Sequence, residues 1–325
     1  MLANQKKKIY IGGSYPNGAI NEITSKTIKE ILEENGFEIE EDYKNANIYI
    51  CNDYTSSARK ELRWFPKDKK ILLVCEPKVV LPNNFKQKIR NQFGFIVSRH
   101  IEDQQYFLQY PQYWNRVVLE SDNRIEKLVV INSNKISLIK GNNYGLRKLS
   151  SKKLAFVDLY GRDWEMGFSQ KIKELLIALK RNVCSKSMID IKSVFVWLSS
   201  NPITQGVVEN KSEIMSKYRY ALVIENQNTY ISEKLFDAFF SGCIPIYIGP
   251  KIDDSIIPNS LFVAATPNLS GIENSFIQIQ AIDYKKWKTN LRSWLSKKET
   301  RLFWDENEVY KILSKRIYEY ISKFN

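Results

Sequence analysis

The sequence predicts an α/β fold with two Rossmann-like domains that face each other across a cleft. The chain has 325 residues, and a domain typically takes about 100–200 residues, so two domains are expected. Strand and helix patterns alternate along the chain with short connections, which is typical of βαβ units and a parallel sheet. The alternation is interrupted once, by the polar segment 120–127, and then begins again.

The first series of elements occupies the first third of the chain. A helix is predicted over residues 21–35, where apolar positions recur at helical spacing and Asn35-Gly36 ends the pattern. The strand-like runs are 8–13, 46–51, 70–75 and 93–97. The third run is almost entirely apolar, as a parallel strand buried on both faces would be. We place the first domain at residues 1–122.

The second series predicts a domain at residues 123–300. Its helix is expected at 232–241, and its strands are expected at 128–131, 154–159, 218–224 and 243–248. Helical patterns at 287–297 and 306–323 close the chain. We expect residues 301–325 to form a basic helix.

The charge balance favours no particular partner. Lys and Arg exceed Asp and Glu by 13, but the excess is diffuse and no RNA-binding or zinc-finger signature accompanies it. No apolar run approaches the roughly 18–20 residues that cross a bilayer, and no signal peptide is visible. We therefore expect a cytoplasmic protein that binds no nucleic acid. The terminal helix mixes basic and apolar residues, so peripheral contact with an anionic membrane at its inner face is a second interpretation of that segment.

The cysteines and the single histidine argue against a metal site. The four cysteines form no C-x-x-C pair, and one histidine is too few for a Cys/His zinc site. Cys51, Cys75 and Cys243 lie in or beside apolar strand-like runs. We expect buried free thiols in a reducing compartment.

The segment 218–250 carries the chemistry. A buried strand delivers Glu225 and Asn226 to its carboxyl end, and a polar loop leads to a helix with Ser232 as its N-cap. A helix N-terminus favours anions, and Lys234 in the first turn adds a full positive charge. Glu233 can accept hydrogen bonds from sugar hydroxyls. Taken singly, these residues also fit a structural interpretation, because acidic residues are common in a first helical turn.

The whole string resembles the donor-binding motif of the α1,3/4-fucosyltransferases, glycosyltransferase family 10. In that family a strand ending in Glu-Asn leads to Tyr-x-[Ser/Thr]-Glu-Lys, followed by a helix and an apolar strand closing in Gly. The matching residues are Glu225-Asn226, Tyr230-Ile231-Ser232-Glu233-Lys234 and 244–249. Arg147 falls where the family has a phosphate-binding Arg, and Ile257–Val263 resembles a later strand of the family. Glu76 precedes Pro77 where the family places its general base.

The resemblance implies a GT-B fold and a fucosyltransferase. GT-B enzymes commonly end in a helix that packs back on the first domain, so the resemblance implies this packing for residues 301–325. The donor would be GDP-β-L-fucose, and the acceptor would be a glycan, such as a lipopolysaccharide chain. Transfer with inversion would give an α-linkage, 1,3 or 1,4 to N-acetylglucosamine. The donor-binding residues would be Arg147 and Lys234 on the diphosphate, Tyr230 beside it, Glu233 on the ribose, and Glu225 and Asn226 lining the pocket.

On the acceptor side, the resemblance makes Glu76 the base that deprotonates the attacking hydroxyl. From the residues alone, Glu76 can equally be a strand-end carboxylate that binds a backbone donor. His100, Gly12 and Gly13 also follow strands and are further candidates for acceptor contact, with a packed histidine and a simple turn as the alternatives. No metal and no other cofactor is expected, because side chains and helix dipoles can neutralise the diphosphate.

Two other functions stay open. Glu233 and Lys234 would contact ribose and phosphate, which every nucleotide sugar carries, so a GT-B transferase using another nucleotide sugar is the first. A basic nucleic-acid-binding protein is the second, and it leaves the ordered Glu-Asn and Glu-Lys elements without an explanation.

Overall fold

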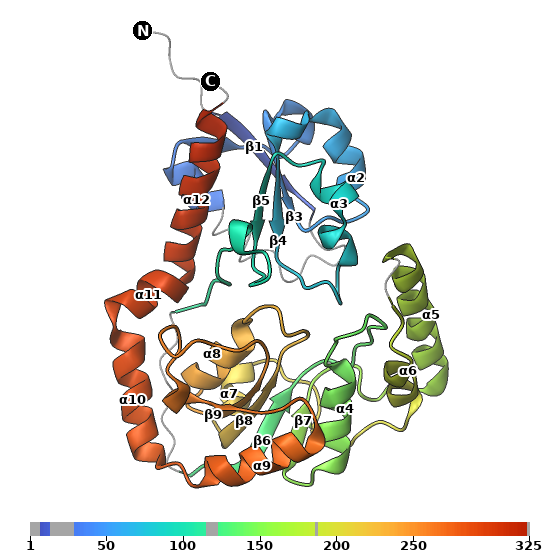
Figure 1. Cartoon of the computed structure of the whole chain (residues 1–325), viewed down its shortest axis with the longest axis vertical. Coiled ribbons are helices and arrows are strands. Elements are labelled where there is room, and N and C mark those ends of the chain that lie inside the picture. Colours follow the sequence, from blue (N-terminus) through green and yellow to red (C-terminus); the bar gives the residue numbers. More distant parts are fainter. Residues whose placement is uncertain (1–6, 14–28, 115–122, 186–187, 324–325) are drawn as a thin grey trace. The chain divides into compact units, whose positions relative to one another are not determined.

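The computed structural model describes residues 7–13, 29–114, 123–185 and 188–323, and the chain forms two compact units (Figure 1). Unit 1 is Met1–Gln112 together with Arg301–Asn325, and unit 2 is Tyr113–Thr300. Each unit contains one five-stranded sheet in which every strand pair is parallel. The first division falls after Gln112 rather than after residue 122. Of the polar segment 120–127, residues 120–122 lie outside the described residues, and 125–127 belong to the first strand of unit 2.

The sheet of unit 1 has the order β2-β1-β3-β4-β5. Its strands are β1 (Lys7–Gly12), β2 (Phe37–Ile39), β3 (Ile48–Asn52), β4 (Lys70–Val74) and β5 (Phe95–Ser98). Four of them confirm the predicted strands, and β2 was missed because three residues are too few for an alternation to be recognised. Of the helix predicted over residues 21–35, residues 29–34 are helical and 21–28 lie outside the described residues.

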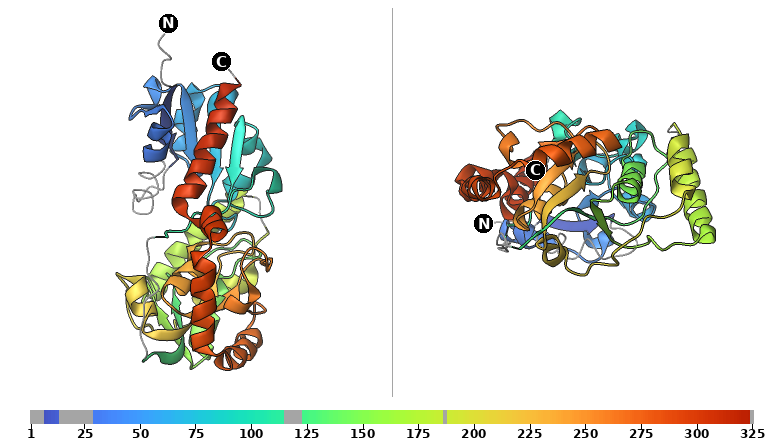
Figure 2. Two further views of the ribbon diagram at one scale, coloured as in Figure 1. Left: turned by 90° about the vertical axis from the view of Figure 1, so that its left-hand side faces the viewer. Right: turned by 90° about the horizontal axis from the view of Figure 1, so that it is seen from below.

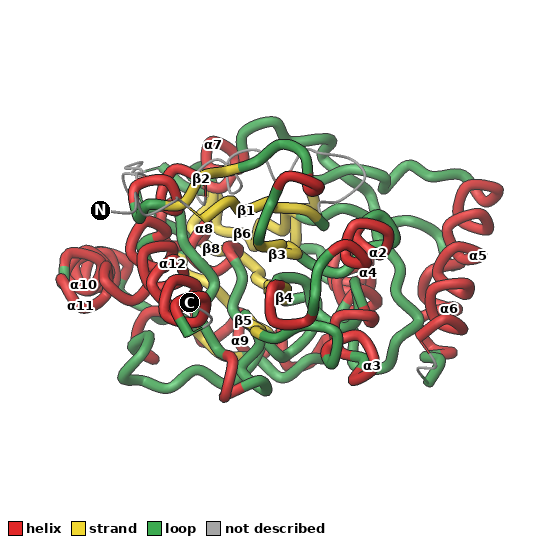
Figure 3. The backbone as a smooth tube through the Cα atoms, turned by 90° about the horizontal axis from the view of Figure 1, so that it is seen from above, coloured by secondary structure: helices red, strands yellow, loops and turns green. Residues whose placement is uncertain are grey.

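Alternate residues of this sheet enter two different cores, because successive side chains of a strand point to opposite faces. Helix α12 (Glu306–Ser322) covers one face, where it meets Ile9, Ile50 and Leu73. The short helix α2 (Ala58–Glu61) lies on the opposite face (Figure 3). Another short helix, α3 (Gln87–Arg90), precedes β5.

Helix α12 is an integral part of unit 1. Its apolar residues Val309, Leu313 and Ile317 are buried in the same core as β1 and β3. The preceding helix α11 (Lys298–Trp304) ends where the backbone N–H of Gln112 donates to Trp304 O at 2.7 Å. Among the described residues of α12, Tyr318 is the one exposed large apolar side chain. The apolar face of this helix is therefore occupied by its own unit and is not available to a membrane.

The sheet of unit 2 has the order β10-β9-β8-β6-β7. Its strands are β6 (Ile125–Ile131), β7 (Val157–Tyr160), β8 (Tyr218–Ile224), β9 (Ile244–Ile248) and β10 (Val263–Ala264). Strands β8 and β9 lie within one residue of the prediction. The strand suggested over Ile257–Val263 is instead a 3₁₀ turn, Asn259–Leu261, followed by β10. Pro258 precedes that turn and cannot donate to a sheet, which accounts for the shorter strand.

The strand order of unit 2 reverses direction between β6 and β8. The chain moves from β6 to β7 through helix α4 (Tyr144–Lys153), and from β8 to β9 through helix α8 (Glu233–Phe240) on the other side. Right-handed crossovers place the two helices on opposite faces of the sheet. Ligands of open α/β sheets bind at the carboxyl ends of the strands at such a switch point. The functional site is therefore expected where β6 and β8 end.

The remaining helices of unit 2 surround this sheet. They are α5 (Phe168–Ser185), α6 (Ile191–Leu198), α7 (Lys211–Met215), α9 (Leu269–Gln280) and α10 (Tyr284–Ser296). Helix α6 packs on α4, and α5 packs on α6, so this pair forms an outer layer beside α4 (Figure 2). None of the described helices of the chain is both long and apolar enough to cross a bilayer. Cys51 and Cys243 are buried free thiols, and Cys75 is partly exposed.

Candidate functional site

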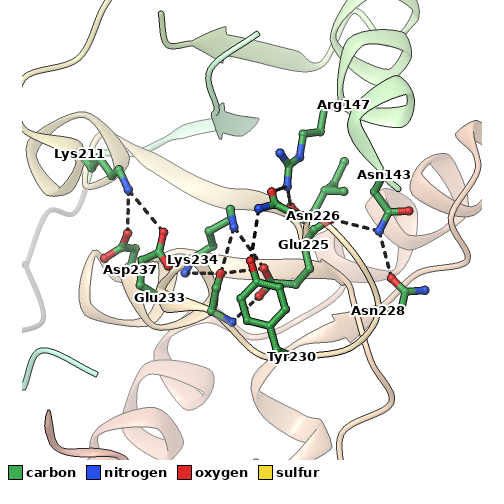
Figure 4. A network of polar contacts seen from close by, with 12 residues as sticks. Asn143, Arg147, Lys211, Glu225, Asn226, Asn228, Tyr230, Glu233, Lys234 and Asp237 are labelled. Atoms are coloured by element: carbon green, nitrogen blue, oxygen red, sulfur yellow. Dashed lines mark hydrogen bonds and ion pairs between the residues drawn. The ribbon is translucent and has the colours of Figure 1, made fainter. Parts of the chain in front are cut away.

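A buried carboxylate joins the end of β8 to the start of α8. Glu225 is fully buried, and its carboxylate accepts hydrogen bonds from the backbone N–H of Ser232 at 2.8 Å and from the Ser232 hydroxyl at 2.7 Å (Figure 4). Ser232 is the N-cap of the helix, as predicted, and its hydroxyl accepts from Lys234 N. Glu225 therefore fixes the position of the helix N-terminus relative to the strand.

The same carboxylate holds the ammonium group of Lys234. Lys234 Nζ lies 3.2 Å from Glu225 Oε2 and 3.0 Å from the Ser232 hydroxyl. The Lys234 side chain is 19% exposed, whereas the Glu225 side chain is fully buried. The ammonium group is thus held by a buried anion, and part of the lysine side chain remains exposed to solvent.

Arg147 of α4 reaches the same strand end from the opposite face of the sheet. It is 4% exposed, and its Nη2 donates to Ile224 O and to Asn226 Oδ1, both at 2.6 Å. Its guanidinium also lies over the ring of Tyr144, 5.0 Å from the ring centroid. Burial holds the pKa of this guanidinium below its usual value. Its Nε is also buried and has no hydrogen-bond partner within the part of the chain that the structure describes.

The loop between β8 and α8 is held by amide side chains. Asn226 Nδ2 donates to the hydroxyl of Tyr230 at 3.2 Å, and Tyr230 is 4% exposed. Asn143, the residue before α4, donates from Nδ2 to Glu225 O at 3.1 Å and to Asn228 Oδ1 at 3.0 Å. The start of α4 and the end of β8 are therefore connected directly.

Glu233 lies on the outer side of the network. Its side chain is 43% exposed and lies 3.9 Å from Lys211 Nζ, which also approaches Asp237 at 3.5 Å. Partial loss of hydration acts to raise the pKa of Glu233, but the charges of Lys234 and Lys211 outweigh this effect and hold the pKa below its usual value. An ionised, accessible carboxylate at this position can accept hydrogen bonds from hydroxyl groups.

The structure thus brings together the six residues predicted for donor binding in unit 2, and Figure 4 shows them in one network with Lys211, Asn143 and Asn228. Two cations, from α4 and α8, meet at the switch point of the sheet, which suits a diphosphate. Glu225 is the one member whose carboxylate is enclosed by its own chain, so it positions Lys234 instead of facing a ligand. Sequence reasoning missed Lys211, which no motif marks, and Asn143, which the Asn142-Asn143 pair before a helix could have indicated.

In unit 1, Glu76 follows β4 and its backbone is held by a buried aspartate. Asp53 accepts hydrogen bonds from Cys75 N at 2.8 Å, from Glu76 N at 3.2 Å and from Asn84 Nδ2 at 2.6 Å. Asp53 is 4% exposed and has a φ of +59°, a conformation that few residues other than glycine adopt. Burial is the main reason that its pKa is raised to about 7. Asp53 follows a predicted strand, so the same strand-end rule that selected Glu76 could have found it.

His100 also supports the backbone of Glu76. One ring nitrogen, Nε2, lies 3.2 Å from Glu76 O, and the ring packs edge-on against Phe85 with 5.0 Å between centroids. The side chain is fully buried, and burial lowers its pKa to about 4. Of the two interpretations of His100, the structure supports a packed histidine, because an acceptor cannot touch a side chain that has no exposed surface.

Gly12 and Gly13 end β1 at the switch point of the unit 1 sheet. Gly13 has a φ of +84°, and a Cβ atom there would lie 2.6 Å from Asp53 O and 2.8 Å from Asn52 O. A side chain is therefore excluded by the close approach of the ends of β1 and β3. This favours the turn interpretation.

Within the described ranges, no three His, Cys, Asp or Glu side chains are grouped so that they could hold a metal ion. Metal independence stays a prediction.

Comparison with known proteins supports the resemblance seen in the sequence. No family model matches the chain. The chain is 28% identical over 186 residues to the α-(1,3)-fucosyltransferase FucT of Helicobacter pylori. The match covers 56% of this chain and 37% of that protein, so the chain corresponds to only part of its relative. The match confirms the resemblance to the fucosyltransferases.

Solved structures confirm the GT-B fold. The Anabaena protein HepE, solved with UDP and glucose, superposes with a TM-score of 0.57 at 10% identity, covering 97% of this chain and 100% of HepE. A glycosyltransferase from Rickettsia africae gives 0.54 at 10% identity, covering 99% and 100%. The β-glucosyltransferase of T4 phage gives 0.51 at 11% identity, covering 98% of both chains. At these identities the similarity shows the fold alone.

Proposed function

We propose that this chain is an inverting glycosyltransferase that transfers L-fucose from GDP-β-L-fucose to a hydroxyl group of a glycan. The observation that carries the proposal is that Arg147 and Lys234 both bind the end of β8, at the switch point of unit 2. Arg147 donates to Ile224 O and Lys234 to Glu225 Oε2, and the accessible carboxylate of Glu233 lies in the first turn of the helix that follows. The similarity to an α-(1,3)-fucosyltransferase supports fucose as the sugar. It also supports an α-1,3 linkage. The alternative 1,4 linkage and N-acetylglucosamine as the acceptor sugar belong to the proposal through the sequence resemblance alone.

In this proposal the unit 2 site acts on the leaving group. As the bond between the sugar and the phosphate breaks, negative charge accumulates on the diphosphate, and fixed cations stabilise that charge more than they stabilise the bound donor. Lys234 is already oriented by Glu225, so little reorganisation is needed. Arg147 adds a second positive charge at the same strand end, Tyr230 packs beside the phosphates, and Glu233 accepts from the ribose hydroxyls.

The acceptor is assigned to unit 1, where Glu76 would be the general base. Its carboxylate takes the proton of the attacking hydroxyl while the fucose carbon passes through an oxocarbenium-like transition state. Asp53 and His100 hold the backbone N–H and carbonyl of Glu76, so the backbone that carries this side chain is fixed by the fold. No metal is required, because the two cations of unit 2 neutralise the diphosphate.

The nucleotide is tested by thermal unfolding with GDP, UDP, CMP and dTDP. A ligand at about 100 times its Kd stabilises a protein by about 2.7 kcal/mol, which is a shift of several degrees for a domain of this size. We expect the shift with GDP in the wild type and in the control Lys251→Met, whose lysine is exposed outside the network, and its loss in Lys234→Met. A larger shift with UDP would favour a transferase of the same fold that uses another nucleotide sugar.

The sugar is tested by comparing GDP-fucose with GDP-mannose as donors in an acceptor array. Preferential release of GDP from GDP-fucose supports the proposal, and preferential turnover of GDP-mannose contradicts the choice of sugar. Binding of DNA or RNA with a steep salt dependence and no response to GDP would support a basic nucleic-acid-binding protein instead.

A further inference from the structure

Exposed apolar side chains are concentrated on the outer layer of unit 2. Across the described residues, 18 large apolar side chains are exposed, and nine of them lie between residues 168 and 207. This segment contains α5 and α6 and makes up about an eighth of the chain. The nine are Phe168, Leu176, Val183, Met188, Ile189, Ile191, Phe195, Ile203 and Val207.

Helix α5 carries an apolar stripe that is not its packing face. The stripe recurs every three or four residues along one side of the helix. Its members are Phe168, Ile172, Leu176, Leu179 and Val183, of which three are 54–72% exposed and two half-buried. The buried side of the helix is formed instead by Lys171, Ala178 and Asn182. The stripe is therefore left uncovered although the helix is fully packed on its other side.

Helix α6 presents a second set of apolar residues in the same way. Ile191 is 66% exposed and Phe195 is 72% exposed, while Ser193 and Trp197 are buried. The indole of Trp197 donates to Lys171 O at 3.0 Å and so joins α6 to α5. The two helices lie side by side (Figures 1 and 3).

Basic residues border the stripe. Lys173 and Lys180 follow it around α5, and Arg181 and Lys192 are exposed on α5 and α6. The acidic residues are fewer: Glu174 is half-buried, and Asp190 caps α6 by accepting from Ser193 N. An exposed apolar face with basic borders is typical of helices that lie in the headgroup region of an anionic bilayer.

We infer that α5 and α6 form a membrane-docking surface that binds the face of a bilayer containing anionic lipids. Helix α5 has 18 residues, which is about 27 Å of helix that can lie flat in the headgroup layer. A second copy of this chain is a poorer occupant, because a symmetric contact would bring the same lysines and arginines together. This surface takes over the role that the sequence suggested for α12, whose apolar face is buried.

The test is flotation with vesicles of phosphatidylcholine and phosphatidylglycerol at about 3:1, against phosphatidylcholine alone, and does not depend on any transfer activity. Wild-type protein is expected to float with the anionic vesicles at low salt. Lys173→Gln/Lys180→Gln/Lys192→Gln should lower the partition coefficient by about 100-fold, at roughly 1 kcal/mol for each charge. Lys311→Gln/Lys315→Gln, on α12, is the matched control and should leave flotation unchanged.

The apolar contribution is tested with Phe168→Ser/Leu176→Ser/Phe195→Ser, which changes exposed side chains and should abolish flotation. Its control is Ile256→Ser/Ile277→Ser/Leu302→Ser, which removes exposed apolar side chains elsewhere and should float as the wild type does. Circular dichroism verifies that each variant is folded. The inference is overturned if wild-type protein fails to float, if the α12 variant alone loses flotation, or if light scattering shows a dimer that the Phe168 variant dissociates.

Discussion

Substitution of Glu225 by Gln tests whether the Glu225 carboxylate has a structural role, which is to orient Lys234. The change preserves the shape of the side chain and removes its charge. In the wild type, the Glu225 carboxylate accepts hydrogen bonds from Ser232 N, from the Ser232 hydroxyl and from Lys234 Nζ at 2.7–3.2 Å. A glutamine amide has one acceptor oxygen, and its NH₂ group would face a donor. At least one of the three bonds is therefore lost.

The cost follows from burial. A hydrogen bond to a charged group contributes about 1.5–3 kcal/mol, and loss of one partner of a buried ion pair costs about 3–5 kcal/mol. Glu225 has no exposed surface, but the Lys234 side chain retains 19% of its exposure and can be partly hydrated. We expect a loss of about 2–4 kcal/mol in the free energy of unfolding of unit 2.

Urea unfolding followed by tryptophan fluorescence measures this loss. Five of the seven tryptophans lie in unit 2: Trp114, Trp164, Trp197, Trp287 and Trp294. Glu233→Gln is the control, since its carboxylate is exposed and 3.9 Å from Lys211. A surface pair of this kind contributes about 0–1 kcal/mol.

The double variant Glu225→Gln/Lys234→Met completes the test. Removal of both partners costs less than the sum of the single changes, because no buried charge is left without a partner. The account of Glu225 as the residue that orients Lys234 is refuted if Glu225→Gln unfolds within about 0.5 kcal/mol of the wild type, or if the two single changes are additive.

Three further predictions address unit 1 and the chemistry. Glu76→Gln should abolish transfer while GDP still stabilises the protein, and near-normal turnover would exclude this residue as the base. Burial raises the pKa of Asp53 to about 7, so the native state holds a proton that the unfolded chain loses above about pH 4, and stability falls as pH rises from about 4 to about 7. Hydrogen exchange of the β4 amides at pH 5 and 8 should show this fall in the wild type and not in Asp53→Asn; an equal fall in both would contradict the assignment. Transfer should persist in EDTA, and complete loss that added divalent cations restore would show a metal requirement.

Much of the fold could be read from local pattern. Strand β8 and helix α8 are bounded by strong signals, an apolar run and a serine N-cap, and they lie within one residue of their predicted ends. The amphipathic spacing of α12 predicted a helix, and its membership in unit 1 was expected from the resemblance to GT-B enzymes. Helices α5 and α6 were not foreseen, because their apolar residues lie on two sides and give no single buried face.

The site was predictable in membership but not in orientation. Glu225 and Glu233 lie in the same motif, yet one carboxylate is buried against Lys234 and the other is exposed. This difference depends on where the chain turns between them, which residue types alone do not determine. Asp53 was overlooked because its role comes from a positive φ and from backbone contacts with a different strand.

The measurement that tests the central claim most directly is calorimetric titration of GDP and GMP into the wild type and into Lys234→Met. The account predicts that the wild type binds GDP at least about tenfold more tightly than GMP, which corresponds to about 1.4 kcal/mol from contacts with the second phosphate, and that Lys234→Met removes this preference. Equal affinity of the wild type for GDP and GMP, or no binding of either, would contradict a diphosphate site at Arg147 and Lys234.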